Sequence, residues 1–155
     1  MPFFFGDYKY TLDNKGRVNI PAKFRNADPK LAQCKYYIYF DEEDVCLHVY
    51  PSDEFEKRVV DFVDKLSTAK KKHRAYSSFL GENVIESSLD KAGRITIPLN
   101  FLEKAKIKKE VKIIGAFTRI ELWDPKVREN YKNELGGAQA KAKLEEEISN
   151  ELERE

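Results

Sequence analysis

The chain has 155 residues, of which 41% are hydrophobic and 12% aromatic. This length fits one ordinary domain, or two small domains with a shared core, and the composition is that of a globular protein. Because 28 Lys and Arg almost balance 27 Asp and Glu, the net charge of +1 gives no indication of a charged partner.

The first half of the chain predicts a short unit of strands and helices. Val18 and Ile20 place two β-branched side chains on one face of a strand, which ends at Pro21 because proline cannot donate to a sheet. After Pro51, apolar residues at helical spacing predict a helix with one buried face. The expected elements are a strand at 8–12, a turn at 13–16, a strand at 18–20, a short helix from 22, strands at 36–40 and 45–50 joined by the acidic turn 41–44, and a helix whose buried residues are Phe55, Val59, Phe62, Val63 and Leu66.

The second half predicts the same order of elements. These are a strand at 83–88, a turn at 90–93, a strand at 95–97, a short helix at 100–105, strands at 111–114 and 120–123, and a helix from 125 to 131. After Gly136 and Gly137 the pattern changes, and Leu144, Ile148 and Leu152 recur every four residues among glutamates. This tail predicts a helix with a narrow apolar seam that needs a partner, or a segment that frays.

Neither half has enough strands to form a core of its own. A unit of about four short strands buries too little apolar surface to be stable alone. The two halves are therefore expected to pack on each other around a closed β core with a pseudo-twofold axis. Aromatic side chains are expected to fill much of this core, namely Tyr37, Tyr39, Phe40, Phe79, Phe117 and Trp123.

One motif occurs in both halves. Residues 13–24 read DNKGRVNIPAKF and residues 90–101 read DKAGRITIPLNF, which indicates a duplicated supersecondary unit. The motif residues are Asp13, Gly16 and Arg17 in the first copy and Asp90, Gly93 and Arg94 in the second. An arginine at the base of a turn can pair with guanine through two hydrogen bonds or bind a phosphate, and the aspartate can hold its guanidinium in place. The alternative is that the aspartate and the arginine only stabilise the turn.

The two copies differ in the charge around the motif. Within the turn, Lys15 of the first copy corresponds to Ala92 of the second. After the proline, the first copy has Lys23 and Arg25, whereas the second has Leu99 and Asn100. Before the turn, the first copy has Lys9, whereas the second has Glu86 and Ser88. We therefore expect the first copy to face DNA and the second to complete the core and the assembly. The expected DNA contacts are Arg17 for base reading or positioning, and Lys9, Lys15, Lys23 and Arg25 for phosphates.

Charge also alternates over longer segments. Residues 1–40 hold seven Lys or Arg against three Asp or Glu, residues 41–64 hold two against nine, and residues 65–81 hold five against none. Such alternation indicates a surface with separate acidic and basic faces, or simply a solvated charged surface. The basic run Lys70-Lys71-Lys72-His73-Arg74 can contact DNA, or it can contact the acidic residues 41–44 or 53–64 of a neighbouring subunit.

Candidate catalytic and metal sites are missing from the sequence pattern. His48 and His73 are the only histidines, and neither has a nucleophile or a metal-ligand partner at useful spacing. Cys34 and Cys46 lack metal-ligand spacing, and two thiols without a disulfide framework suit a reducing cytoplasm. The apolar run at 3–5 is too short for a signal peptide, and no run approaches the length of a membrane span. We predict a soluble, cytoplasmic protein that is not an enzyme and uses no cofactor or metal.

The duplicated Asp-x-x-Gly-Arg-Val/Ile-x-Ile-Pro motif resembles the MraZ family of bacterial transcriptional regulators, which belong to the AbrB-like swapped-hairpin class. The resemblance extends from Phe4 to the helix after Pro125. It implies an α+β, mainly β fold, in which two tandem AbrB-like β-hairpin units pack as a pseudo-twofold swapped-hairpin barrel with peripheral helices. It also implies a nucleoid-associated, ring-shaped homo-oligomer, an octamer or larger. This ring would bind double-stranded DNA at short direct repeats in the promoter of a cell-division and cell-wall gene cluster, as a repressor.

The expected organisation has four parts. A first AbrB-like repeat with a DNA-facing turn occupies residues 1–70, a basic linker 71–81, a second repeat 82–135, and a charged helical or disordered tail 136–155. Few contacts per subunit would bind DNA weakly, so a ring that presents several subunits to repeated sites would gain affinity through effective concentration. The alternative function is a structural or protein-binding ring in which the motif only folds the chain. A single-repeat AbrB-like antitoxin is disfavoured by the duplication.

Overall fold

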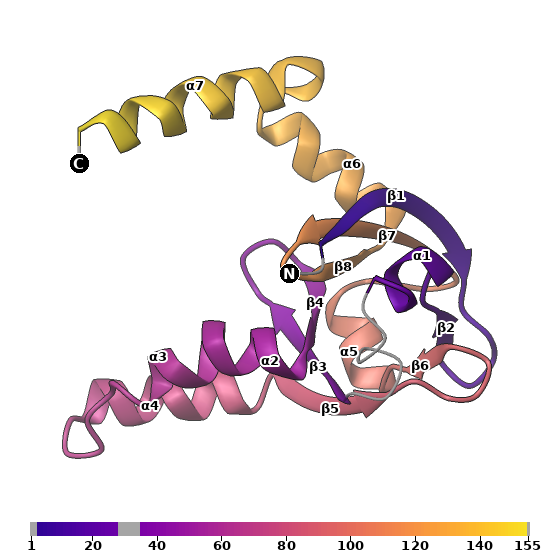
Figure 1. The fold of residues 1–155 in the computed structure, drawn as a ribbon, viewed down its shortest axis with the longest axis horizontal. Coiled ribbons are helices and arrows are strands. Elements are labelled where there is room, and N and C mark those ends of the chain that lie inside the picture. Colours follow the sequence, from indigo (N-terminus) through magenta and orange to yellow (C-terminus); the bar gives the residue numbers. More distant parts are fainter. Residues whose placement is uncertain (1–2, 28–34, 155) are drawn as a thin grey trace.

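The computed structural model describes residues 3–27 and 35–154. In the first half, the elements are β1 (Phe4–Thr11), β2 (Arg17–Asn19), α1 (Ala22–Arg25), β3 (Lys35–Asp41), β4 (Cys46–Pro51), α2 (Ser52–Phe55), the π-helical turn η1 (Glu56–Val60) and α3 (Asp61–Val63). They continue as α4 (Lys71–Gly81), β5 (Val84–Ser88), β6 (Arg94–Thr96), α5 (Leu99–Lys104), β7 (Glu110–Phe117), β8 (Ile120–Trp123), α6 (Pro125–Glu134), η2 (Gly137–Gln139) and α7 (Ala140–Glu153). The predicted strands and helices occur in the predicted order in both halves, and helix α4 is an additional element where a linker was expected (Figure 1).

The strands of the two halves interleave. The main sheet has the order β1-β7-β8-β4-β3-β5, and all neighbouring strands are antiparallel. β1 of the first half pairs with β7 of the second, and β5 of the second half pairs with β3 of the first. The short strands β2 and β6 form a separate two-stranded ribbon. This exchange between two repeats agrees with the expected swapped arrangement of antiparallel strands and helices. Closure of the main sheet into a barrel stays a prediction.

The hydrophobic core joins the ribbon to the inner face of the main sheet. Val18 and Ile95 lie opposite each other in the ribbon and are almost completely buried. They belong to the same apolar cluster as Leu47 of β4 and Leu122 of β8, which are paired at the centre of the main sheet. Full burial of each such side chain is worth about 1.5 to 3 kcal/mol, so the two halves stabilise each other through this shared core.

The prediction of the core aromatic residues is partly wrong. Phe79 and Phe117 are each 61% exposed. Side chains alternate along β3, so Tyr37 and Tyr39 lie on its outer face while Tyr36 points into the core. Phe40 and Trp123 are buried as predicted. Among the described residues, Phe4, Phe24, Tyr36, Phe55 and Phe101 are buried as well.

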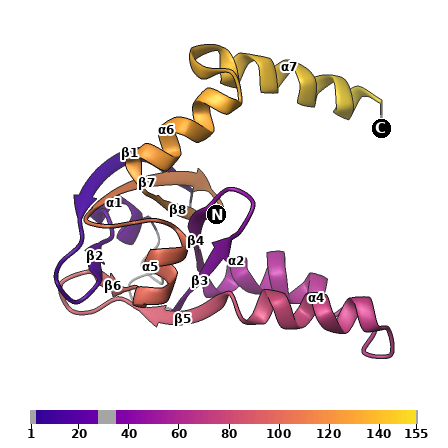
Figure 2. The ribbon, with the colours of Figure 1, turned by 180° about the vertical axis from the view of Figure 1, so that it is seen from behind.

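Residues 52–81 form a helical hairpin that projects from one side of the sheet (Figures 1 and 2). The chain runs outward through α2, η1 and α3 and returns through α4, so the segment expected to be a linker is a helix. Phe55 is buried against the sheet, but Phe62 is 50% exposed and contacts Tyr76 of α4, with 5.9 Å between ring centroids. The predicted buried stripe is therefore wrong at its outer end, because there the helix packs only on another helix.

Helix α6 lies beside the outer face of the sheet, and α7 extends away from it (Figure 1). Pro125 opens α6 in the first helical position, and the Asp124 side chain caps the helix by accepting from the Val127 N–H at 3.0 Å. The tail expected to be helical or disordered is helix α7, on which Ile148 and Leu152 are exposed. Among the helices of the described residues, none has both the length and the hydrophobicity needed to span a membrane.

Candidate nucleic-acid interface

The first turn of the motif is organised by one carboxylate. Asp13 Oδ1 accepts from the backbone N–H groups of Lys15 and Arg17, both at 2.9 Å. Asp13 Oδ2 accepts from Arg17 Nε at 2.6 Å. The Gly16 N–H also donates to the Asp13 carbonyl at 3.1 Å. These bonds fix the start of the arginine side chain at the base of the turn.

The second turn repeats this pattern. Asp90 Oδ1 accepts from the backbone N–H groups of Ala92 and Arg94, and Asp90 Oδ2 accepts from Arg94 Nε, each at 2.9 Å. The Gly93 N–H donates to the Asp90 carbonyl at 3.0 Å. The alternative interpretation, in which the aspartate and the arginine stabilise the turn, is therefore supported in both copies. Within each turn, the aspartate binds the guanidinium of its arginine only at Nε, so the terminal Nη nitrogens are not needed to stabilise the turn.

Both turns require glycine. Gly16 and Gly93 have φ values of +74° and +78°, in the left-handed region that favours glycine. A Cβ atom at Gly16 would lie 2.8 Å from the backbone oxygen of Ile97, and one at Gly93 would lie 2.7 Å from the Arg25 side chain. Ile97 belongs to the second half and Arg25 to the first, so each turn packs closely against the other half.

The hydrogen bonds of the turns favour ionised carboxylates. The pKa of Asp13 is lowered to about 2, chiefly by the backbone N–H of Arg17 and further by the guanidinium of Arg17 and the backbone N–H of Lys15. The pKa of Asp90 is also lowered, chiefly by the backbone N–H of Arg94. Both aspartates are therefore charged at neutral pH, and both arginines are held as ion pairs.

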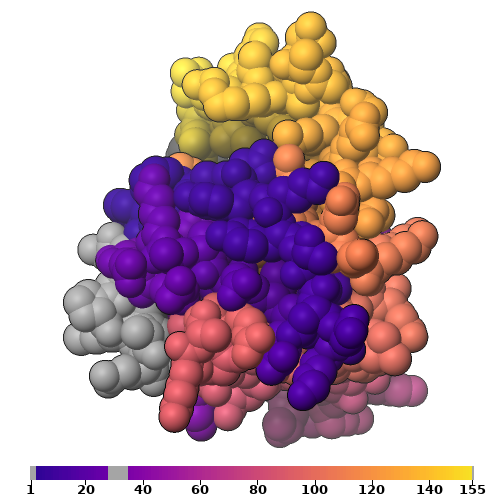
Figure 3. Space-filling model, turned by 90° about the vertical axis from the view of Figure 1, so that its right-hand side faces the viewer, coloured from indigo at the N-terminus to yellow at the C-terminus, as the bar shows by residue number. Residues whose placement is uncertain are grey.

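The β2–β6 ribbon brings the two arginines to the same face. Val18 and Ile95 point into the core, so the residues next to them in each strand point to the opposite side. That outer face carries Arg17, Asn19, Arg94 and Thr96. Arg94 Nη1 lies 3.7 Å from Asp13 Oδ2, so one carboxylate contacts the arginines of both repeats. Figure 3 shows the indigo segment of the first repeat beside the salmon segment near residue 90 on one surface.

The ends of both guanidinium groups remain accessible on this face. The side chains of Arg17 and Arg94 are 29% and 30% exposed. Within the described residues, the Nη atoms of Arg17 have no hydrogen-bond partner, and Arg94 uses only Nη1, in the contact with Asp13. Because Nε is bound to aspartate in each case, the outward Nη atoms present rigidly oriented donors.

The predicted phosphate contacts lie in different environments. Lys15 is exposed at the tip of the first turn. Lys23 is exposed and lies over the Phe5 ring, 4.2 Å from its centroid. Lys9 is exposed on β1 but pairs with Glu110 at 3.3 Å. Arg25 is half-buried, and its Nε donates to the Ile20 carbonyl at 2.9 Å, so this arginine supports the fold of the motif.

Sequence reasoning missed two cations beside the first turn. Lys108 and Lys109 line a groove of about 560 Å³ together with Lys15. The Leu12 N–H donates to the Lys109 carbonyl at 2.8 Å, which joins the two segments. No local signal could reveal this proximity, because Lys108 and Lys109 follow the second copy of the motif. In contrast, the alternation within each strand already placed Arg17 and Asn19 on one face.

The remaining candidate side chains lie away from the ribbon. His73 Nδ1 accepts from the Ser67 N–H at 2.8 Å and so stabilises the helical hairpin. The expectation that His48 has no potential metal ligand nearby is wrong, since Asp41 and Asp44 lie beside it. Cys46 is a buried free thiol, and Cys34 lies outside the described residues.

Comparison of the sequence with known proteins finds the same family that the duplicated motif resembles. The chain matches the family model "MraZ protein" twice, over residues 3–80 and 78–151. It is 41% identical over 128 residues to the transcriptional regulator MraZ of Thermoanaerobacter sp. (strain X514), which covers 83% of this chain and 85% of that protein. The transcriptional regulator MraZ of Natranaerobius thermophilus is 35% identical over 131 residues, which cover 84% of this chain and 87% of that protein. The transcriptional regulator MraZ of Desulfitobacterium hafniense is 34% identical over 139 residues, which cover 90% of this chain and 93% of that protein.

These matches confirm the resemblance and the presence of two repeats. They also agree with the prediction that the chain is not an enzyme, because the relatives are transcriptional regulators. Both copies of the motif, the exchanged strands and the two matches of the family model lead to one conclusion. The chain belongs to the MraZ family.

Proposed function

We propose that this protein is a sequence-specific DNA-binding transcriptional regulator and that the outer face of the β2–β6 ribbon contacts duplex DNA. The observation that carries the proposal is the pair of arginines, one from each repeat, held by aspartates on a single exposed face. Such a face presents preoriented donors of the kind that pair with guanine in the major groove. The names of the relatives support the regulatory role.

The contacts with DNA divide between the arginines and the lysines. Arg17 and Arg94 read or position bases, because both lie on the ribbon face. Lys15 and Lys23 bind phosphates, with Lys108 and Lys109 as further candidates beside the first turn. The excess of positive charge therefore stays with the first turn, as the sequence predicts, while base reading involves both repeats. Lys9 has a smaller part because Glu110 neutralises it.

The assembly is proposed to be a ring, an octamer or larger, that binds promoter direct repeats of a cell-division and cell-wall gene cluster as a repressor. Exposed aromatic residues support contact between subunits, since Phe3 and Phe117 form an exposed pair with ring centroids 6.3 Å apart. Several ribbons in one ring would bind repeated sites with increased effective concentration. We place this function in the cytoplasm, at the nucleoid. A structural or protein-binding ring remains the alternative function.

The test is binding of Arg17→Ala and Arg94→Ala to the DNA upstream of the protein's own gene, measured by fluorescence anisotropy and footprinting against scrambled duplex. Arg58→Ala is the matched control, because Arg58 also pairs with a carboxylate four residues away, Glu54, but lies on the helical hairpin. Loss of one bidentate base contact costs about 1 to 3 kcal/mol, so each ribbon variant is expected to bind about 5- to 150-fold more weakly. The control is expected to bind like the natural protein.

The outcomes separate the models. Equal losses of DNA affinity in both ribbon variants support a DNA-binding face that is formed by both repeats. A loss of affinity in Arg17→Ala alone supports the model in which only the first repeat faces DNA. Unchanged binding in both variants, with the assembly intact by light scattering, contradicts the ribbon as the interface. No preference of the natural protein for its own upstream DNA over scrambled duplex favours the structural ring.

A further inference from the structure

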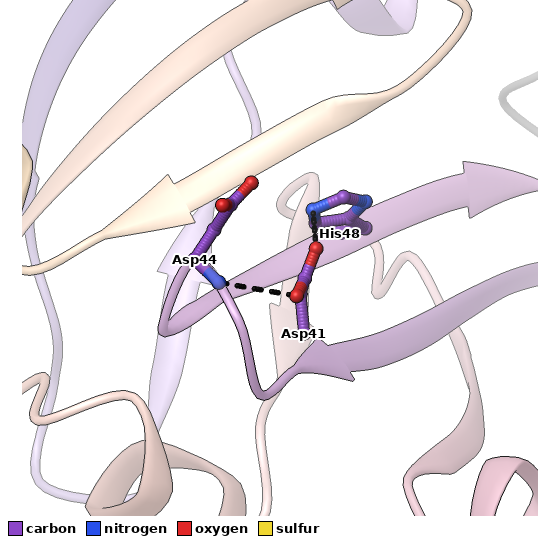
Figure 4. A group of neighbouring side chains, drawn as sticks. All are labelled: Asp41, Asp44 and His48. Atoms are coloured by element: carbon purple, nitrogen blue, oxygen red, sulfur yellow. Dashed lines mark hydrogen bonds and ion pairs between the residues drawn. The ribbon is translucent and has the colours of Figure 1, made fainter. Parts of the chain in front are cut away.

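We propose that Asp41, Asp44 and His48 form a binding site for one divalent transition-metal ion of the Zn²⁺ type. The three residues lie at the tip of the β3–β4 hairpin and the start of β4, and their potential ligand atoms lie within 4.8 Å of one another. Figure 4 shows the two carboxylates and the imidazole ring gathered at this tip. The site is separate from the ribbon and goes beyond the proposed DNA-binding function.

His48 supplies the independent indication of a ligand. The residue is only 7% exposed, and neither ring nitrogen has a hydrogen-bond partner among residues 3–27 and 35–154. Burying a polar group without a partner is unfavourable, so most buried polar side chains have one and each exception calls for an explanation. His48 Nε2 lies 3.4 Å from Asp41 Oδ2, which places its lone pair or proton at the carboxylate cluster. A metal ion at this point would satisfy the ring nitrogen.

The spacing of the ligand atoms fits direct coordination. Two ligands held about 2.05 Å from a tetrahedral ion lie about 3.3 Å apart, close to the separation of His48 Nε2 and Asp41 Oδ2. Asp41 Oδ1 is already occupied by the N–H groups of Glu43 and Asp44, which fixes the carboxylate and leaves Oδ2 toward His48. The Asp44 carboxylate accepts one long hydrogen bond, from the Tyr131 hydroxyl at 3.5 Å, and one of its oxygens lies within 4.8 Å of the other two ligand atoms.

The charges around the site also favour a cation. Asp41 and Asp44 place two carboxylates beside the imidazole, and Glu121 of β8 lies opposite His48 in the sheet. Arg119 and Arg128 bring positive charge to the same region and pair with Glu121, at 2.7 and 3.7 Å, which leaves Asp41 and Asp44 as the carboxylates available to a cation.

The donor set points to a class of metal. One imidazole and two carboxylates suit Zn²⁺, Co²⁺ or Ni²⁺, with water completing the coordination, whereas Ca²⁺ and Mg²⁺ prefer oxygen ligands alone. Bound metal would fix the hairpin tip and, through the contact between Asp44 and Tyr131, influence the position of α6. Helix α6 leads into α7, so occupancy of the site can affect the orientation of the tail.

The experiment uses the full chain without a histidine tag, freed of metal with a chelator and then titrated with ZnCl₂ and CoCl₂. Calorimetry gives the stoichiometry, and Co²⁺ absorption reports the ligand type. We expect one ion per chain and a loss of affinity of at least about tenfold in Asp44→Asn, because a charged carboxylate ligand is replaced by a neutral, more weakly coordinating amide. Glu43→Gln is the matched control, since it removes one negative charge from the same turn but lies outside the group. It is expected to change the affinity less than threefold, about 0.65 kcal/mol.

Three results would overturn the proposal. The first is no saturable binding of either metal, and the second is an equal loss in Asp44→Asn and Glu43→Gln, which indicates general attraction to negative charge. The third is a thiolate-to-cobalt charge-transfer band, which assigns the metal to a cysteine. His48→Asn is a further test if it folds, and Asp44→Asn decides the question if it does not, because the Asp44 side chain is only partly buried.

Discussion

At the residue scale, the two turns show how few atoms define the motif. One carboxylate accepts two backbone N–H groups and one guanidinium in each copy, and all the donors lie within four residues of it. Asp13 has one further contact, with Arg94 of the other repeat. This single contact links the two arginines that we propose to bind DNA, so the carboxylate has both a local and a long-range role.

Alanine in place of the turn glycines is expected to destabilise the protein. Left-handed backbone costs a residue other than glycine about 1 to 2 kcal/mol. Gly16→Ala should lower the free energy of unfolding more than Gly93→Ala, because its Cβ meets a backbone oxygen and that of Gly93 meets a flexible side chain. Gly81→Ala is the control, since a Cβ there meets no atom of the described residues within 4 Å and its φ is not positive. Urea unfolding checks the order, and equal effects at all three positions contradict it.

The Asp13 turn is expected to lose stability in acid. The pKa of Asp13 is about 2 in the folded chain, below its ordinary value of 3.8. A lowered pKa means that the ionised carboxylate stabilises the fold above about pH 4 and that this contribution is lost as the pH falls toward 2. Asp13→Asn removes the titration, so its stability relative to the natural protein should improve over this interval. An NMR titration of the Asp13 carboxyl carbon with a midpoint near 3.8 would contradict the assignment.

At the element scale, local sequence determines where helices and strands end. Pro21, Pro51, Pro98 and Pro125 each precede or open a helix, as the sequence predicts. The end of α5 follows a pattern that the sequence does not reveal. Lys106 adopts a φ of +60°, the Lys106 N–H donates to the Glu103 carbonyl, and the Ile107 N–H donates to the Leu102 carbonyl. This is a Schellman motif, in which Ile107 and Leu102 are both buried.

Glycine is expected to suit this helix end better than lysine. Lys106→Gly should raise the free energy of unfolding by about 0.5 to 1 kcal/mol, because glycine adopts the left-handed backbone without strain. The greater conformational freedom of glycine in the unfolded chain offsets only part of this gain. Lys108→Gly is the control, since it removes the same charge at an exposed position without positive φ. Thermal and urea unfolding measure both variants. A loss of stability in Lys106→Gly would show that its side chain contributes more than its backbone costs.

At the scale of the whole molecule, the exchange of strands makes the two repeats interdependent. β1 pairs with β7 over Phe4–Thr11 and Glu110–Phe117, and β5 pairs with β3 in the same exchanged way. Each repeat alone therefore lacks the partner of its first strand. The shared core also makes the repeats interdependent. Val18 of the first repeat and Ile95 of the second lie opposite each other in the ribbon and belong to the same core cluster.

Separated repeats are expected not to fold as monomers. Fragments 1–81 and 82–155 should show little regular structure or should self-associate, because each exposes unpaired strands and half of the core. Mixing them in equal amounts should restore a one-to-one complex with the circular dichroism of the intact chain. Size measurement with light scattering distinguishes these states. A fragment that is folded and monomeric by itself would contradict the interdependence of the repeats.

The sequence by itself determined the repeat, the order of the elements, the turn chemistry and the family, because these depend on residues close together in the chain. Asp13 and Arg17 are four positions apart, so their bond could be anticipated from the spacing. Tertiary structure decided which strands pair, that Arg94 shares a face with Arg17, and that Phe79 and Phe117 stay exposed. Those outcomes depend on burial against segments far away in the chain. Local propensity cannot select among several antiparallel partners of similar composition.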